Sequence, residues 1–226
     1  MTFPAWSLLL LAAVAGCRDG ETVFQPVADS CLKPPVTVRQ TYDCLRAWHG
    51  RGAYGAMRPY IDPSAVDSLI DLLVAVDELM AANASALSTV ARACPGMDDS
   101  RLDLSYLERY MDLFSRDVEF IREQQKGDQA TMTIQVADRL PLIELRFRRA
   151  AVARNDFRWV YTPGRAVPEL TNLLRDITGG LNQFALVLSH AEGMTPESVQ
   201  REFDLRVMTR LRRHAALLSA SRPAES

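Results

Sequence analysis

The residues best suited to acid–base chemistry are few and lie far apart in the sequence. His49 and Tyr42 fall on one predicted helix, and Asp138 falls at a predicted hairpin. An imidazole or a carboxylate acts as a general acid or base where its surroundings adjust its pKa. His49 stands one turn after Leu45 and could point inward, although a histidine at a helix C-terminus more often contacts the last carbonyl groups. These three residues are the catalytic candidates.

The remaining titratable residues form no catalytic signature. Asp77 and Glu78 are neighbours, about 100° apart on a helix, so they cannot converge as a catalytic pair. We expect them to face solvent or to serve as capping partners. His190 and His214 are isolated, and both are expected at the surface. The sequence contains no Gly-rich phosphate loop, no Gly-x-Ser-x-Gly and no His-Glu-x-x-His. No cofactor is expected.

The N-terminus carries a different kind of chemistry. The apolar run Leu8–Val14 with its flanks has only about half of the ~20 residues that a membrane-spanning helix needs, which is typical of a signal peptide. Val14-Ala15-Gly16-Cys17 follows directly and resembles the lipobox of bacterial lipoproteins. The resemblance implies cleavage before Cys17 and acyl chains on its thiol. Residues 1–16 lack Lys and Arg, so an ordinary signal peptide or an anchor helix is the alternative.

Lipid on Cys17 would place the protein on a membrane rather than through it. Two or more acyl chains make a stable anchor, whereas one gives marginal binding. Residues 17–35, with adjacent prolines, are expected to be a tether. Arg18, not Asp, follows the cysteine, which by resemblance to enteric sorting favours the outer membrane. The expected location is the cell envelope, facing the periplasm.

The other cysteines are odd in number. Cys31, Cys44 and Cys94 predict one disulfide and one free thiol in an oxidising compartment. A Cys31–Cys44 bond would close a loop of roughly 15 residues and stabilise by about 3 kcal/mol. A Cys44–Cys94 bond would join two helices, and buried unpaired thiols are a further alternative. Without Cys-x-x-Cys or a histidine cluster, no metal site is expected.

Composition indicates a folded domain that does not bind nucleic acid. About 48% of the residues are hydrophobic and the formal net charge is −2, so no overall basic field attracts a phosphate backbone. All basic residues except Lys33 and Lys126 are arginine, which suits anion recognition but also follows from GC-rich codons.

Apolar periodicity changes from helical to strand-like and back. Val38, Tyr42, Leu45 and Trp48 make one helical stripe. The spacing predicts helices over Val36–His49, Met57–Ile61, Ala65–Ala93 (one or two, with Ser64 as cap), Leu104–Ser115, Val167–Ser189 (broken or kinked near Gly179-Gly180) and Thr195–Ser219 (capped by Thr195). Alternation of period two predicts an antiparallel meander with one apolar face over Val118–Glu123, Ala130–Val136, Ile143–Arg148 and Phe157–Thr162.

The last predicted helix has two distinct faces. Its expected buried stripe is Val199, Phe203, Val207 and Leu211. The rest is crowded with Arg201, Arg206, Arg210, Arg212 and Arg213. Such a face is either simply solvated or contacts anionic lipid or cell-wall polymer.

Opening helices, a curved antiparallel sheet and the closing Arg158-Trp159-Val160-Tyr161 resemble the NTF2-like, or cystatin-like, α+β fold. The resemblance covers residues 36–163 and implies a cone of sheet around a helix. Residues 164–219 are expected to be a helical extension, and residues 220–226 a disordered tail. In such a cone an apolar pocket would be lined by Trp48, Phe147, Trp159 and Tyr161, although the same residues suit a plain core.

Two functions follow as hypotheses. The first is a lipid-anchored envelope module without catalysis, which binds an envelope protein or a small apolar ligand or acts as a scaffold or spacer. The second is a cone-fold enzyme of isomerase, dehydratase or hydrolase type with His49 or Asp138 as base. The second requires a buried pocket that holds an imidazole or a carboxylate.

Overall fold

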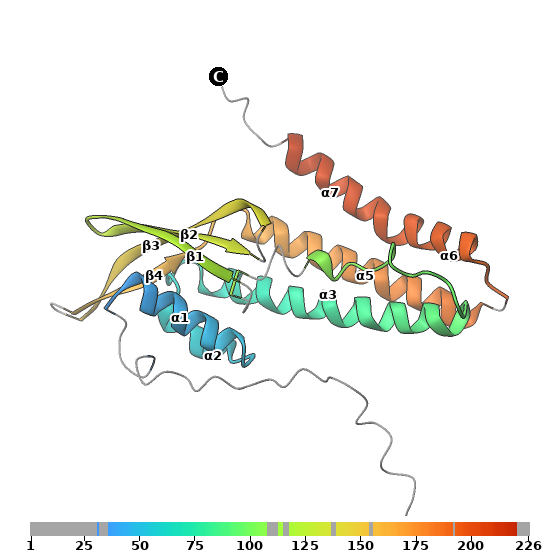
Figure 1. The fold of residues 1–226 in the computed structure, drawn as a ribbon, viewed down its shortest axis with the longest axis horizontal. Coiled ribbons are helices and arrows are strands. Elements are labelled where there is room, and N and C mark those ends of the chain that lie inside the picture. The colour runs from blue at the N-terminus through green and yellow to red at the C-terminus, as the bar shows by residue number, and fades with distance from the viewer. Residues whose placement is uncertain are drawn as a thin grey trace, which may run out of the picture.

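The computed structural model describes residue 31 and residues 36–107, 113–114, 118–136, 139–153, 156–191 and 193–220. In these residues an antiparallel sheet and helices on both sides of it in sequence make an α+β fold (Figure 1). This confirms the predicted fold class. The predicted signal peptide, most of the predicted tether and residues 221–226 lie outside the described residues.

The first helix, α1 (Val38–His49), forms as its sequence predicts. Thr37 accepts a hydrogen bond from the backbone N–H of Gln40, and the Gln40 side chain accepts one from the Thr37 N–H. This capping box satisfies two donors that the helix itself leaves unpaired. Val38, Tyr42 and Leu45 are buried, so the stripe predicted from spacing is the one that packs.

The segment after α1 turns the chain back toward the sheet. Its short elements are α2 (Tyr54–Met57) and the 3-10 turn η2 (Arg58–Tyr60). The next helix, α3 (Val66–Ala93), is one continuous helix. The prediction that Ser64 caps it is wrong: the Ser64 N–H and hydroxyl both donate to Asp62, at 3.0 and 2.8 Å, and no side chain caps α3. Asp62 thus engages the donors of Ser64 in a turn of its own.

The strands form a simple meander. Within the described residues they are β1 (Val118–Lys126), β2 (Gln129–Val136), β3 (Arg139–Ala153) and β4 (Asp156–Thr162), hydrogen-bonded antiparallel in that order. The predicted alternation is confirmed on one face, where Met132 pairs with Leu145 and Phe147 pairs with Tyr161. Most of the predicted short helix over Leu104–Ser115 lies outside the described residues.

The sheet departs from the prediction of a single apolar face at three points. In β1 only Val118 is buried, and the strand is exposed from Glu119 to Lys126. Val160 is fully buried although it points to the opposite face, because the chain before α3 runs beside β4: Ile61 bridges Tyr161, and the Asp62 N–H donates to the Tyr161 carbonyl at 2.8 Å. Phe157, expected in the core, is 49% exposed near the start of β4, beneath the guanidinium of Arg149.

The helix after the sheet is not broken at its paired glycines, where the sequence predicts a break or a kink. Helix α5 (Val167–His190) runs unbroken through both glycines. A Cβ atom on Gly180 would lie 2.4 Å from the Arg206 carbonyl oxygen. Glycine is therefore required here for close approach of a second helix, not for a bend.

That second helix is a composite rod. It consists of α6 (Pro196–Phe203), the π-helical turn η3 (Asp204–Met208) and α7 (Thr209–Ala220). Thr195 caps it with Ser198 in a capping box, as predicted for Thr195. Val199, Phe203 and Val207 are at most 1% exposed, which confirms that part of the predicted stripe; Leu211 is half-buried.

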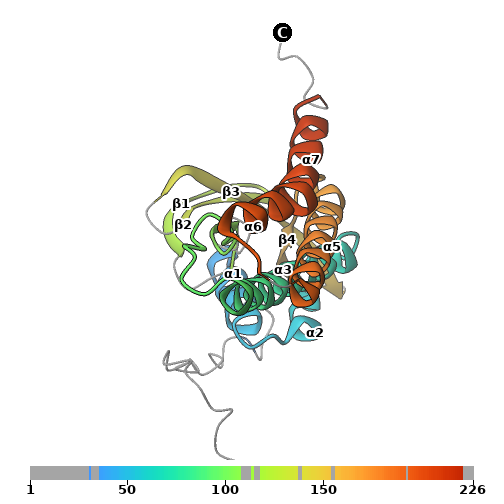
Figure 2. The same ribbon diagram turned by 90° about the vertical axis from the view of Figure 1, so that its right-hand side faces the viewer.

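The helices give the molecule two ends. Helices α3 and α5 lie side by side and run in the same direction away from the sheet, and the α6–α7 rod returns along α5 (Figure 1). Viewed along the long axis, α6 and α7 lie on the opposite side of the molecule from α1 and α2 (Figure 2). One core cluster extends from the sheet into the helices. Among the described residues, no helix is long and apolar enough to cross a membrane.

Candidate functional site

Two of the predicted catalytic candidates, His49 and Tyr42, lie around one phenylalanine. The His49 ring centroid is 5.9 Å from that of Phe114 and 5.9 Å from that of Tyr54. The Tyr42 ring lies 6.1 Å from Phe114. The end of α1, α2 and the residues before the sheet thus form an aromatic corner of His49, Tyr42, Tyr54 and Phe114.

The tyrosine hydroxyls of the aromatic corner donate to groups on neighbouring segments. Tyr54 donates to the carboxylate of Asp77 on α3, and Tyr42 donates to the Leu113 carbonyl at 2.9 Å. The Tyr54 ring therefore lies against the His49 imidazole, and its hydroxyl connects the aromatic corner to the Asp77 carboxylate. Because Asp77 is exposed and the His49 and Tyr54 rings are half-buried, these groups open to solvent and not into the sheet.

The residues predicted to line an apolar pocket are packed against other side chains instead. Phe147, Trp159 and Tyr161 are 2%, 4% and 4% exposed within the core cluster. The Tyr161 ring contacts Phe147 at 5.6 Å and Phe114 edge-on at 5.7 Å. Burial raises the pKa of Tyr161 to about 12, which keeps its phenol neutral at physiological pH. Trp48 is half-buried and has the Arg51 guanidinium over its ring.

A partly buried ion pair that the sequence did not predict joins the segment after η2 to the sheet. The Asp62 side chain is 6% exposed and accepts a hydrogen bond from the Arg148 guanidinium of β3. That bond and those from Ser64 hold the pKa of Asp62 well below its usual range, against the opposing effect of burial. Sequence reasoning missed this pair because Asp62 and Arg148 are 86 residues apart.

A second polar cluster joins α5 to α7. Arg210 donates to the Asp176 carboxylate, to the Asp176 carbonyl at 3.3 Å and to Gln183 at 2.9 Å. His214 contacts the other Asp176 carboxylate oxygen at 3.2 Å. The prediction that His214 is an isolated surface residue is wrong, because α7 packs back on α5. His190 is exposed, as predicted. The sequence carried a signal for this cluster: the polar residues Glu202, Arg206, Arg210 and His214 recur every four positions and so lie along one flank of the helix.

A small polar hollow lies between the first turns of α3 and α5. Its volume is about 110 Å³, below the several hundred Å³ of typical ligand pockets. It is lined by Ser68, Asp71, Pro168, Thr171, Asn172 and Arg175. This lining and size suit water better than an apolar ligand.

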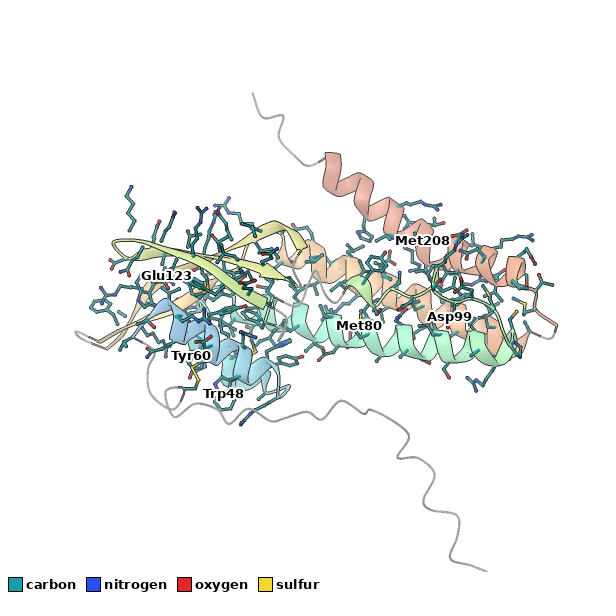
Figure 3. The ribbon with its side chains drawn as sticks, viewed as in Figure 1. Trp48, Tyr60, Met80, Asp99, Glu123 and Met208 are labelled. Carbon is teal, nitrogen blue, oxygen red and sulfur yellow. A yellow bond between two sulfur atoms is a disulfide. The ribbon has the colours of Figure 1, made fainter. Side chains whose placement is uncertain are left out.

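The cysteines resolve the pairing that the sequence left open. Cys31 is bonded to Cys44, and Cys94 is free and buried. The Tyr60 hydroxyl also donates to the Cys31 carbonyl at 2.5 Å. Figure 3 shows Tyr60 and Trp48 on the side of the molecule that carries the disulfide. The chain that leads from the N-terminus is therefore fixed to α1 at Cys31.

The remaining predicted sites are not placed. Cys17 and Asp138 lie outside the described residues. Within the described ranges, no group of three or more His, Cys, Asp or Glu side chains is arranged to hold a metal ion. No protein-family model, curated protein or solved structure matches the chain. Interpretation of function therefore depends on the sequence and on the geometry described above.

Proposed function

We propose that this protein is a lipid-anchored component of the bacterial cell envelope, cut before Cys17 and held on a membrane by acyl chains. The anchor is supported by Val14-Ala15-Gly16-Cys17 at the end of an apolar run too short to span a bilayer. Arg18 directly after the cysteine favours the outer membrane, with the domain in the periplasm. The disulfide between Cys31 and Cys44 fits an oxidising compartment.

We also propose that α1 and the sheet form an NTF2-like cone. In support, α1 lies against β4, where the Thr41 hydroxyl donates to the Trp159 carbonyl at 3.1 Å. Each of the three strand pairs has a shift in register, and such irregularities bend strands. The long helix α3 and the helices after residue 164 extend beyond the compact pattern of that fold.

The anchored domain works by binding, not by catalysis. The observation that carries this part of the proposal is the filled inner face of the sheet, where Phe147, Trp159 and Tyr161 are at most 4% exposed. A substrate has no room among side chains packed at this density. The buried carboxylate nearby, Asp62, is paired with Arg148, and its lowered pKa makes it a weak base at neutral pH.

The alternative is a cone-fold enzyme that acts on a small apolar substrate. The observation that favours it is the grouping of His49, Tyr54 and Asp77 at the aromatic corner. The two functions differ in their response to His49→Ala. In a deletion strain, the binding module carrying this substitution complements like the wild type, whereas the enzyme loses complementation.

The anchor is tested by the intact mass and membrane fractionation of the expressed wild-type protein. A membrane-bound species with the mass of residues 17–226 plus acyl chains is expected. Cys17→Ser is expected to leave the protein without added acyl mass. Cys94→Ser is the matched control, because Cys94 is buried within the fold and its loss should leave acylation unchanged. A wild-type product that is soluble and carries no acyl chains would overturn the proposal.

A further inference from the structure

The rod formed by α6, η3 and α7 repeats its surface chemistry every four residues. Val199, Phe203 and Val207 face α5 and are buried. On the other side the same spacing gives Arg201, Leu205, Thr209 and Arg213, all exposed. Arg212 is exposed beside them. We call these five residues, Arg201, Leu205, Thr209, Arg212 and Arg213, the arginine row.

The π-helical turn makes this row straight. In an α-helix of 3.6 residues per turn, each step of four residues rotates a stripe by about 40°. In η3 the Thr209 N–H donates to the carbonyl of Asp204, five residues earlier, which widens the turn. The wider turn offsets the rotation, so the apolar stripe stays on α5 and the arginine row stays on the opposite side.

Among the described residues, the arginines of the rod fall into two groups: those on one flank form ion pairs with acidic side chains, and those in the arginine row do not. On the flank, Arg206 pairs with Glu202, and Arg210 pairs with Asp176. In the row, Arg201, Arg212 and Arg213 have no ion pair or hydrogen bond with any described residue. No acidic residue occurs from Leu205 to the end of α7. Glu197, one turn before Arg201, belongs to the first turn of α6, where a negative charge favours the helix dipole.

We infer that the arginine row binds an anionic phospholipid surface. Arg201 at one end of the row and Arg212 and Arg213 at the other are exposed, and each guanidinium group can bind a phosphate of a planar surface in a bidentate manner. Leu205 is 62% exposed in the middle of the row, where an apolar side chain can enter the boundary between headgroups and acyl chains. The row thus combines the two contacts that a helix lying on a membrane uses.

This inference deepens the proposed function by giving the chemistry of one binding partner. It depends on that proposal only for its cellular setting, because the row itself is independent of Cys17. An unacylated chain therefore tests the row, and acylation of Cys17 is tested separately. Residues 18–226 contain every contact that the structure describes, so this chain is suited to the measurement.

The test is co-sedimentation of residues 18–226 with vesicles of phosphatidylcholine that contain 30% phosphatidylglycerol, and with pure phosphatidylcholine vesicles. We expect binding to the anionic vesicles at low salt and its loss at high salt. Each basic side chain near such a surface strengthens binding about fivefold. The variant Arg201→Gln/Arg212→Gln/Arg213→Gln should therefore partition about a hundredfold more weakly.

The matched control removes the same charge elsewhere. Lys126→Gln/Arg146→Gln/Arg165→Gln changes three exposed basic residues away from the rod and should retain most of the binding. Leu205→Ser should weaken binding without changing its salt dependence. Equal losses in the two triple variants would overturn the inference, as would absence of vesicle binding. Row-dependent binding to isolated cell wall without vesicle binding would overturn it in favour of an anionic polymer.

Discussion

The sheet end and the helical end of the molecule are stabilised by different kinds of contact. At the sheet end, the Cys31–Cys44 disulfide and the pair of Asp62 with Arg148 connect segments distant in sequence. At the helical end, α5 and the rod meet through the edge-on rings of Phe184 and Phe203 and through the backbone contact at Gly180. The polar cluster of Asp176, Gln183, Arg210 and His214 adds to these contacts. The sheet end is thus distinguished by its covalent link, and the helical end by the close packing of two helices.

This difference predicts which changes destabilise each end. The apolar contacts of the helical end depend on van der Waals fit, so small changes of volume are costly there. The pair at the sheet end depends on ionisation, so pH affects it. Trp48 and Trp159, the tryptophans that follow Cys17, both lie at the sheet end. Tryptophan fluorescence therefore reports on that end, and helical circular dichroism is weighted toward the other.

The largest effect is expected from Phe203→Ala. Phe203 is 1% exposed, and its truncation should lower the free energy of unfolding by about 3–5 kcal/mol. Leu205→Ala, two positions away on the exposed side, should change it by less than about 0.5 kcal/mol. Chemical denaturation followed by circular dichroism measures both. Because one core cluster joins the two ends, the fluorescence transition should shift with it; a fluorescence transition that does not move would show that the ends unfold independently.

An intermediate effect is expected at the paired glycines of α5. Gly180→Ala should destabilise by about 2 kcal/mol, because its Cβ would overlap the Arg206 carbonyl oxygen. At Gly179 the nearest atom outside the helix is 3.9 Å from such a Cβ, so Gly179→Ala should stabilise by about 0.5–1 kcal/mol through helix propensity. Thermal unfolding of both variants checks the sign. Equal changes would mean that the rod does not approach α5 as described.

The smallest effect is expected from the ion pair and depends on pH. The folded-state pKa of Asp62 is depressed, so its contribution is present above the unfolded value of about 4 and is lost as pH falls below it. Asp62→Asn should cost about 1.5 kcal/mol at pH 7 and less at pH 3, as measured by denaturation with tryptophan fluorescence. Asp128→Asn, in an exposed pair with Arg149, should cost below about 0.5 kcal/mol. An equal cost for Asp62→Asn at pH 7 and pH 3 would exclude ionisation as its source.

The candidate site could be predicted from sequence only in its local parts. Tyr42 and His49 lie on one helix with a clear apolar spacing, so the sequence could predict that they share one side of that helix. Their neighbours Tyr54 and Phe114 come from other segments, and Asp77 was expected to contact solvent or a helix end. Trp159 and Tyr161 were placed correctly on the sheet, but periodicity does not distinguish a filled core from a pocket.

By itself the sequence determined the helix α1 with its cap, the alternating strands β2 and β3, and the four-residue stripe of the rod. These features follow from backbone geometry over a few residues, so local spacing specifies them. Only the tertiary structure decided which cysteines pair, that α5 continues through its paired glycines, and that Asp62 meets Arg148. Those outcomes depend on which distant segments come together. Local sequence patterns do not show which distant segment a residue will contact, and that segment determines each of these features.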